Sequence, residues 1–305
     1  MKASATQAIV CHDPVEGKRQ WILEPISIVT KVQPGDAVLL SFAFCTQCHN
    51  CQFGAPGYCH KFTELNFVGN KEAFPGSKDE PSKAIGGSFF GQSSLAQHTR
   101  VQETSMVKVT HLVNSREELS MFAPLGCGIQ TGAGTITQLG QAGPNNKSAI
   151  MAAKLTGCRN IIGIDRVASR LELAKILGAT HVVNTSELSG TLVDEIRNIT
   201  GGSGSTITVD ATGATPLIQQ GVEFTPNQGK MILLGVAPMD AGFEVQIIPY
   251  MVTGKQLMGS MEGGVYPEQE SLADRPIFQL ITVKDYLKAV RDMEDGVTIK
   301  PILLW

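Results

Sequence analysis

Apolar and polar positions alternate in the first third of the chain, in short segments separated by turns. Residues 6–10 (TQAIV) have this strand-like pattern. Residues 36–44 (DAVLLSFAF) predict a second strand, which the turn QPGD at 33–36 introduces. Residues 86–101 (GGSFFGQSSLAQHTRV) predict a further pair of strands. The first third is therefore expected to be a β-rich, turn-rich unit.

The pattern changes from about residue 148, where helical and strand-like segments alternate. Residues 148–157 (SAIMAAKLTG) predict a helix that ends at Gly157, and residues 169–178 (SRLELAKILG) predict a second that ends at Gly178. Residues 283–296 (VKDYLKAVRDMEDG) predict an amphipathic helix. This alternation indicates an α/β fold with a parallel, doubly wound sheet. Short apolar runs predict its buried strands at 160–165, 181–183, 206–213 and 230–236.

Composition narrows the class of protein. A chain of 305 residues with 42% apolar and 17% charged residues is typical of a globular protein of about two domains. The formal net charge of −3 favours neither a nucleic-acid nor a membrane partner. No apolar run approaches the length of about 20 residues that spans a bilayer, and the N-terminus shows no secretory signal. We therefore expect a cytoplasmic protein with reduced thiols.

Four of the seven cysteines fall within residues 45–59 (CTQCHNCQFGAPGYC), with the spacing C-x2-C-x2-C-x7-C. Zinc binds four thiolates tetrahedrally, and the glycine and proline residues before the last cysteine supply the turns that bring it back. A metal-free loop and an iron–sulfur cluster are the alternatives. A zinc ion held by four thiolates has no open position, so this site would organise a lobe without taking part in chemistry. The expected ligands are Cys45, Cys48, Cys51 and Cys59.

Five longer segments, taken in order, resemble the zinc-dependent medium-chain alcohol dehydrogenase family, in particular its fungal and bacterial aryl- or benzyl-alcohol type. The first runs from KVQPGD through the four cysteines, and the second is FFGQSSLAQH. PLGCGIQTGAGT resembles the stretch with the last ligand of the catalytic zinc. MAAKLTGCRNIIGIDRVASRLELAKILGATHVVN resembles the second half of the coenzyme-binding unit, and GVTIKPILLW the last strand of the family.

The resemblance implies a fold and a reaction. It implies a GroES-like β-barrel catalytic domain with the structural-zinc lobe at 1–128, a Rossmann domain at 129–258, and a return to the first domain at 259–305. A catalytic zinc would polarise the oxygen of a small alcohol or aldehyde while hydride moves between carbon and nicotinamide. The expected protein is a homo-oligomer with an aromatic or allylic primary alcohol as substrate.

The sequence departs from the family at the catalytic zinc. Cys127 aligns with the third of three ligands, but GKRQWILEPISI passes directly into VTKVQPGD, and the segment that carries the first two is not there. The group Cys11-His12-Asp13 lies in the first strand, where the family places no ligand, so we do not expect it to substitute. One thiolate does not hold a catalytic zinc firmly, which predicts little or no turnover by this chain.

A second departure concerns the coenzyme. QAGPNNK passes straight into SAIMAAKL without a strand and the loop G-x-G-x-x-G, so we expect an incomplete sheet. GCGIQTG at 126–132 has the wrong spacing to replace that loop. Asp165 is expected to accept the ribose hydroxyls, which favours NAD over NADP; its alternative role is a turn cap. Arg170 resembles a position near the adenosine ribose, and Lys300 one near the pyrophosphate, unless it is a solvated lysine beside Pro301.

A third departure lies at 266–286, where the family has a longer helix-bearing stretch. Three family segments are missing between segments that match the family well. This pattern indicates skipped exons, a mis-assembled gene model or a recent loss of these pieces from the gene. Two hypotheses of different classes follow. The first is a zinc-type alcohol dehydrogenase, and the second is a non-catalytic remnant or mis-assembled product that retains the structural-zinc lobe.

Overall fold

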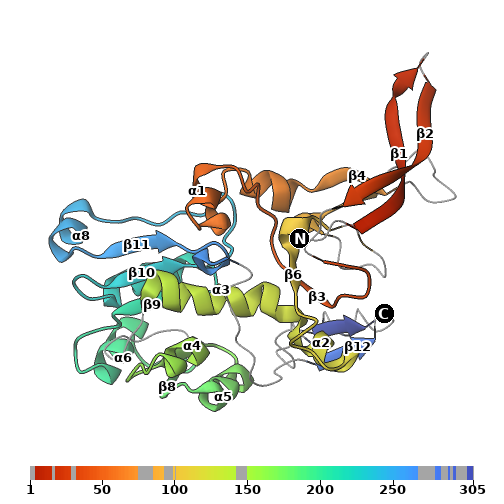
Figure 1. The fold of residues 1–305 in the computed structure, drawn as a ribbon. Coiled ribbons are helices and arrows are strands. Elements are labelled where there is room, and N and C mark those ends of the chain that lie inside the picture. Colours follow the sequence, from red (N-terminus) through yellow and green to blue (C-terminus); the bar gives the residue numbers. More distant parts are fainter. Residues whose placement is uncertain are drawn as a thin grey trace.

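The N-terminal half is built from short antiparallel strand pairs (Figure 1). The computed structural model describes residues 4–15, 18–28, 32–74, 85–92, 99, 101–141, 150–266, 279–282, 288, 291–292 and 301–304. Strands β1 and β2 form a hairpin, β3 pairs with β6, and β4 pairs with β5. Their bounds are β1 (Ser4–Val15), β2 (Lys18–Ile28), β3 (Val38–Leu40), β4 (Asn70–Phe74), β5 (Ile85–Gly87) and β6 (Met106–Lys108).

Two predicted strands in this half are shorter or absent. The strand expected over 36–44 covers only β3, and the pair expected over 86–101 is wrong at η3 (Phe89–Gly91), a 3-10 turn. Phe90 has φ 55° there, and its ring packs edge-on against Phe62 and Phe67 with centroids 6.4 and 5.5 Å away. Aromatic packing has overridden the local strand pattern at this point. Residues 93–98 and 100 of the expected pair lie outside the described residues.

A run of helical segments joins the two halves and was not predicted. Its helices are α2 (Arg116–Phe122), η5 (Ala123–Gly126), α3 (Gly128–Gly134) and η6 (Thr135–Gly140). The sequence GIQTGAG has three glycines, which lower helix propensity and hide the pattern. Burial stabilises the helix instead. Ile136 is fully buried and packs with Ala133, Ala152 and Val209.

The C-terminal half confirms the expected alternation of helices and strands. The helix predicted to end at Gly178 does so, while α4 ends at Leu155, shortly before the predicted Gly157; both glycines have positive φ. All four predicted strands form, while α6, α7, α8 and β11 were not predicted. The elements are α4 (Ile150–Leu155), β7 (Ile162–Asp165), α5 (Ala168–Leu177), β8 (His181–Asn184), α6 (Leu192–Ile199), β9 (Ile207–Asp210), α7 (Thr215–Phe224), β10 (Lys230–Leu233), α8 (Ile247–Thr253), β11 (Gln256–Gly259) and η7 (Glu262–Gly264).

The parallel strands from β7 to β11 form two separate sheets among the described residues. One is β7-β8 and the other is β11-β10-β9. A doubly wound dinucleotide-binding sheet has the strand order 3-2-1-4-5-6. The order β8-β7 matches its strands 3-2, and β9-β10-β11 matches 4-5-6. The position between them belongs to the first strand, which the sequence predicts to be missing.

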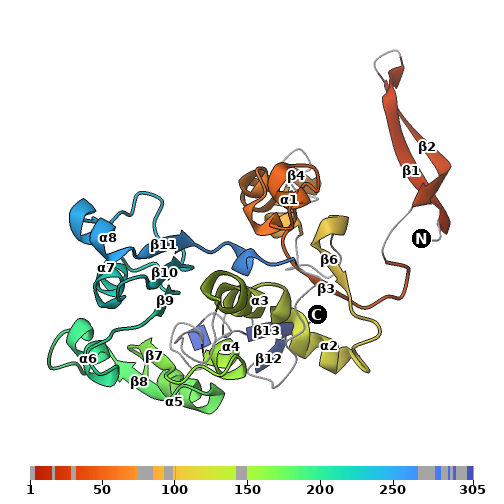
Figure 2. The same ribbon diagram turned by 60° about the vertical axis from the view of Figure 1, so that its left-hand side comes forward.

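The last described elements are two parallel strands, β12 (Gln279–Thr282) and β13 (Pro301–Leu304). Strand β13 contacts α2, and both views show these strands beside that helix (Figure 1 and Figure 2). Of the amphipathic helix predicted at 283–296, Lys288, Arg291 and Asp292 are helical, and the rest lies outside the described residues. Among the helices that the structure describes, none has the length and apolarity to cross a membrane.

Candidate functional site

The structure brings the four clustered cysteines together. The ligand atoms of Cys45, Cys48, Cys51 and Cys59 all lie within 4.8 Å of one another. The Sγ of Cys51 is 3.5 Å from that of Cys48 and 4.0 Å from that of Cys45. A tetrahedral zinc ion with Zn–S bonds of about 2.3 Å requires sulfur atoms about 3.8 Å apart. The cluster therefore has the size and the chemistry of a zinc site.

Backbone N–H groups point at the sulfur atoms and hold them in place. The N–H of Cys48 donates to Cys45 Sγ at 3.3 Å, and those of Cys45 and Lys61 donate to Cys59 Sγ at 3.4 Å each. The short helix α1 (His49–Gln52) and the 3-10 turn η1 (Pro56–Tyr58) set this loop geometry. Donors of this kind favour the thiolate form, which is the form that binds metal.

The cluster has two kinds of thiol. The backbone N–H groups of His60 and Cys51 lower the pKa of the Cys48 thiol to about 6. Burial raises the pKa of the Cys51 thiol to about 12, and burial also raises that of Cys59. One side of the cluster is thus ready to ionise at neutral pH, whereas the other would need the positive charge of a metal to do so.

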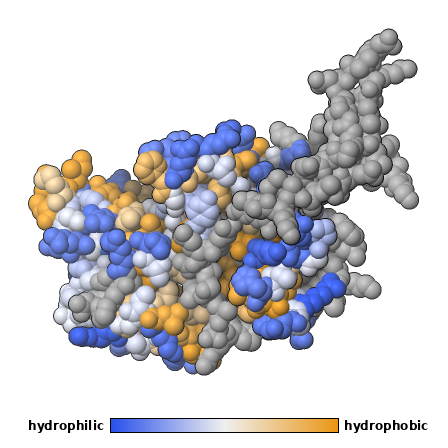
Figure 3. Space-filling model, in the orientation of Figure 1, coloured by the Kyte–Doolittle hydropathy of each residue, from blue (hydrophilic) through white to orange (hydrophobic). Residues whose placement is uncertain are grey.

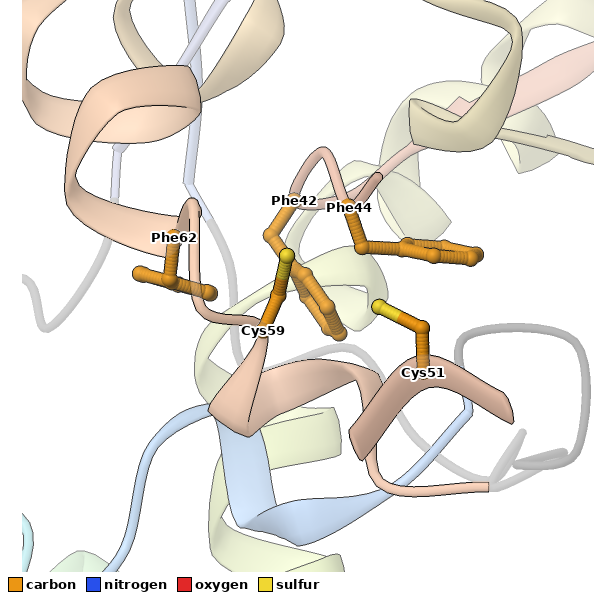
Figure 4. Close-up of a cluster of buried hydrophobic side chains, with 5 residues drawn as sticks. All are labelled: Phe42, Phe44, Cys51, Cys59 and Phe62. Carbon is orange, nitrogen blue, oxygen red and sulfur yellow. The ribbon is translucent and has the colours of Figure 1, made fainter. Parts of the chain in front are cut away.

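Aromatic rings close the buried side of the cluster. Phe42 is fully buried, and Phe44 and Phe62 are 5% and 6% exposed. Figure 4 shows the sulfur atoms of Cys51 and Cys59 pointing into the space beside these rings. Such a wall keeps water and substrate from the sulfur atoms. The geometry is that of a closed, structural site.

The loop with this cluster packs on the segment that follows β11. The hydroxyl of Tyr58 donates to the carbonyl of Gly259 at 3.0 Å. A Cβ atom on Gly57 would lie 2.5 Å from the carbonyl oxygen of Met261, so only glycine fits there. The rings of Phe44 and Tyr266 meet edge to face, with centroids 5.2 Å apart. The lobe is therefore attached to residues 259–266.

Cys127 lies apart from this cluster, exposed, at the N-terminus of α3. Within the described part of the chain, the four-cysteine group is the one set of three or more His, Cys, Asp or Glu side chains placed to share a metal ion. The alternative group Cys11-His12-Asp13 lies in β1, where the structure describes only the backbone. The described residues therefore do not fit a catalytic zinc.

Asp165 ends β7, at the carboxyl edge of its sheet, where the sequence places it. Its Oδ1 accepts hydrogen bonds from the N–H groups of Arg166 at 2.7 Å and Val167 at 2.9 Å. These bonds give Asp165 the alternative role of a turn cap. Its Oδ2 lies 3.8 Å from a guanidinium nitrogen of Arg170. These two side chains therefore meet at one point, as the adenosine half of a coenzyme would require. Lys300 lies outside the described residues.

Two further acidic residues were missed by sequence reasoning. Asp210 ends β9, is 7% exposed, and accepts hydrogen bonds from Thr212 Oγ1 at 2.6 Å and the N–H of Gly213 at 2.9 Å. The turn DATG directly after an apolar strand is a signal that could have found it. Glu262 is 5% exposed in η7 and contacts α3. Nothing in its local sequence predicts that contact.

Comparisons with known proteins agree with this arrangement. Residues 147–275 match the family model described as "Zinc-binding dehydrogenase". A "Probable alcohol dehydrogenase" from Pseudomonas sp is 34% identical over 247 residues, which are 77% of this chain and 76% of the relative. This chain belongs to the zinc-dependent medium-chain alcohol dehydrogenase family. "Geraniol dehydrogenase" from Castellaniella defragrans is 32% identical over 301 residues, 91% of this chain and 79% of the relative.

Solved structures confirm the fold class of this alcohol dehydrogenase. The benzyl alcohol dehydrogenase of Acinetobacter calcoaceticus superposes with a TM-score of 0.78 and 31% identity, over 93% of this chain and 81% of that one. The expected class, a GroES-like domain joined to a Rossmann sheet, is therefore correct, and the chain is an enzyme by family. Zinc and a nicotinamide coenzyme are the cofactors of this family.

Proposed function

We propose that this alcohol dehydrogenase interconverts a primary aromatic or allylic alcohol and its aldehyde. The observation that carries the proposal is the pair of relatives named above. One is named for geraniol, an allylic primary alcohol, and one for benzyl alcohol, an aromatic one. Each matches this chain at 31–32% identity over nine-tenths of its length or more. The substrate is on this basis a small apolar alcohol.

The proposed coenzyme is NAD, which supplies the hydride acceptor when it is bound. Asp165 is placed to accept the hydroxyls of the adenosine ribose, and a 2′-phosphate would be repelled by its carboxylate. Arg170, 3.8 Å from that carboxylate, holds it in position. Lys300 would reach the pyrophosphate. The proposal gives these three residues the adenosine half of the coenzyme.

The proposed structural-zinc ligands are Cys45, Cys48, Cys51 and Cys59. Their spacing, the N–H groups aimed at their sulfur atoms and the aromatic wall support this role. Four thiolates must stay reduced to bind zinc, so a cytoplasmic location is part of the proposal. Cys127 is proposed as the remaining ligand of the catalytic zinc. It is the single ligand of three for which this sequence supplies a match, so we expect little or no turnover by this chain.

The proposed domains are a GroES-like unit at 1–128, a Rossmann unit at 129–258 and a return segment at 259–305. Two features of the structure support these bounds. Helix α3 begins at Gly128, directly after Cys127. Strand β11 ends at Gly259, and the chain then returns to contact the zinc loop at Tyr58.

A homo-oligomer is proposed through the face of α8 and β11. Strand β11 is an edge strand, paired only with β10 among the described residues. Helix α8 beside it exposes apolar side chains, and Figure 3 shows hydrophobic colour at that end of the molecule. An exposed apolar face beside an open strand edge is a typical protein interface. The exposed fractions are 79% for Ile247, 62% for Ile248, 65% for Met251 and 70% for Val252.

Aldehyde-dependent NADH oxidation tests the proposal. The purified chain is assayed with benzaldehyde and with geranial, next to the Acinetobacter calcoaceticus enzyme. We expect at most a slow rate that needs both aldehyde and NADH, and any such rate should fall further in Cys127→Ser. A rate equal to that of protein-free buffer, with folded and zinc-loaded protein, would support the non-catalytic alternative, which the comparisons do not favour.

A further inference from the structure

Glu262 is a buried acidic residue with a left-handed backbone. The residue is 5% exposed, and its φ is 51°, in the region that favours glycine. Burial of a carboxylate and a left-handed backbone at a residue other than glycine are both unfavourable. Its neighbours Gly263 and Gly264 also have positive φ. Unfavourable conformations of this kind persist where the surroundings hold them, and they concentrate at functional positions.

The carboxylate of Glu262 holds the first turn of α3. Its Oε2 accepts a hydrogen bond from Thr131 Oγ1 at 3.1 Å and lies 3.5 Å from Gln130 Nε2. The N–H of Thr131 donates to the carbonyl oxygen of Cys127 at 2.8 Å. The hydroxyl of Thr131 has one proton, which it donates either to Glu262 or to the same carbonyl oxygen, 2.7 Å away. Gln130 is also buried and contacts Ser41 at 3.2 Å. The contacts of one carboxylate thus lead to the residue that begins the helix, Cys127.

The position of Glu262 depends in turn on the zinc loop. Tyr58 and Gly57 hold the backbone at Gly259 and Met261 on the lobe side. On the helix side, a Cβ atom on Gly134 would lie 2.7 Å from the carbonyl oxygen of Gly263. Residues 259–264 are therefore wedged between the zinc loop and α3. A change in the shape of the loop must move this segment or its contacts with the helix.

We propose that Glu262 is a positioning residue that couples the four-cysteine loop to Cys127. With zinc bound, the loop fixes residues 259–264, and Glu262 fixes Thr131 and the start of α3. When zinc leaves, Gly57 and Tyr58 no longer hold the segment, and the first turn of α3 loosens. The proposal goes beyond the dehydrogenase function, because it describes how one metal site sets the geometry at another position. It rests on the proposed function only for the role given to Cys127.

Amide hydrogen exchange and thiol alkylation test this coupling without an activity assay. Peptides that cover 127–135 are followed in the zinc-loaded protein, in Glu262→Ala and in Glu262→Gln, together with the rate at which iodoacetamide modifies Cys127. We expect exchange in this segment to rise about tenfold in Glu262→Ala, because a hydrogen bond to a charged group is lost. Glu262→Gln keeps an acceptor oxygen and should restore most of the protection. Glu117→Gln, at an exposed position of α2, is the matched control.

Removal of zinc, alone and combined with the Glu262 substitution, tests whether the two changes are coupled. Chelation should raise exchange at 127–135 in the wild-type protein and in Glu117→Gln, but add little in Glu262→Ala, because coupled changes are not additive. An additive effect, or no effect of chelation on this segment while the zinc loop itself opens, would overturn the proposal. If Glu262→Ala does not fold, Thr131→Val removes the hydroxyl that contacts both Glu262 and the Cys127 carbonyl, and Thr131→Ser retains it. Equal exchange in those two variants would also contradict the proposal.

Discussion

The hydroxyl of Tyr58 donates a hydrogen bond to the carbonyl oxygen of Gly259, 3.0 Å away, and so joins the zinc loop to the end of β11. Tyr58→Phe removes this bond and should lower the free energy of unfolding by about 1 kcal/mol, the usual net value of one hydrogen bond. We also expect faster loss of zinc to a chelator. Urea unfolding and a chelator-competition assay measure the two effects. Tyr250→Phe, on α8, is the control and should leave zinc loss unchanged.

Zinc content follows from the ligands that the chain supplies. We expect about one zinc ion per chain, held by the four-cysteine loop, because structural zinc needs four ligands and the described residues offer one such set. Cys48→Ser should release the metal and destabilise the lobe, since binding of structural zinc contributes directly to folding. Cys127→Ser should keep its zinc. Elemental analysis of the three proteins gives the answer, and two tightly held ions in the wild type would contradict it.

Coenzyme affinity should be low compared with that of an intact relative. Without a Gly-rich turn the pyrophosphate loses backbone N–H donors, which should weaken binding about a hundredfold or more. Calorimetry with NADH measures this. Asp165→Ala should weaken binding further. Asp165→Asn can still accept the N–H groups of Arg166 and Val167, so it separates the loss of the turn cap from the loss of the ribose contact. Micromolar binding by the wild type would show that the chain has rebuilt the phosphate site.

Acid should weaken the turn that leads into β3. Lys108 Nζ lies 2.7 Å from Asp36 Oδ2, and this hydrogen-bonded ion pair lowers the pKa of the Asp36 carboxyl below its ordinary value. A lowered pKa in the folded state means that the stabilisation is complete above the unfolded-state value of about 3.9 and is lost as the pH falls through the folded-state value. Asp36→Asn should therefore be less stable than the wild type at pH 7, and the difference should shrink towards pH 3. Urea unfolding at both pH values measures it, and a constant difference would disprove this origin.

The oligomer interface can be tested with one charge. Ile248→Asp, on the exposed face of α8, should shift the protein towards monomers in sedimentation velocity, because an unpaired carboxylate would be buried in the interface. Leu155→Asp is the control, at an exposed apolar position of α4. Equal sedimentation of wild type and Ile248→Asp as oligomers would place the interface elsewhere, and a monomeric wild type would disprove the oligomer.

Local sequence patterns could predict the features that depend on neighbouring residues. They could not predict the features that depend on contacts between distant parts of the chain. The cysteines within residues 45–59 could be predicted to form one site because their spacing alone restricts the loop. Asp165 could be predicted as a site residue because it ends a strand. Helix α3 was missed because its glycines lower its propensity and packing around Ile136 supplies the stability. Glu262 was missed for a different reason. Its partner Thr131 lies 131 positions earlier, and no local pattern records such a contact.

The division of the parallel strands into two sheets has a consequence for how the molecule melts. In a continuous sheet, backbone hydrogen bonds join every strand to the next, so the strands come apart together. Here β7 and β9 share no such ladder among the described residues, and the two parts meet through side chains such as Ile136, Ala152 and Val209. Contacts of that kind transmit less cooperativity than a shared ladder. A second contact of this kind is the buried cluster that packs Val183 of β8 with Phe224 of α7, so we expect the two parts to unfold with less cooperativity than the strands of one continuous sheet.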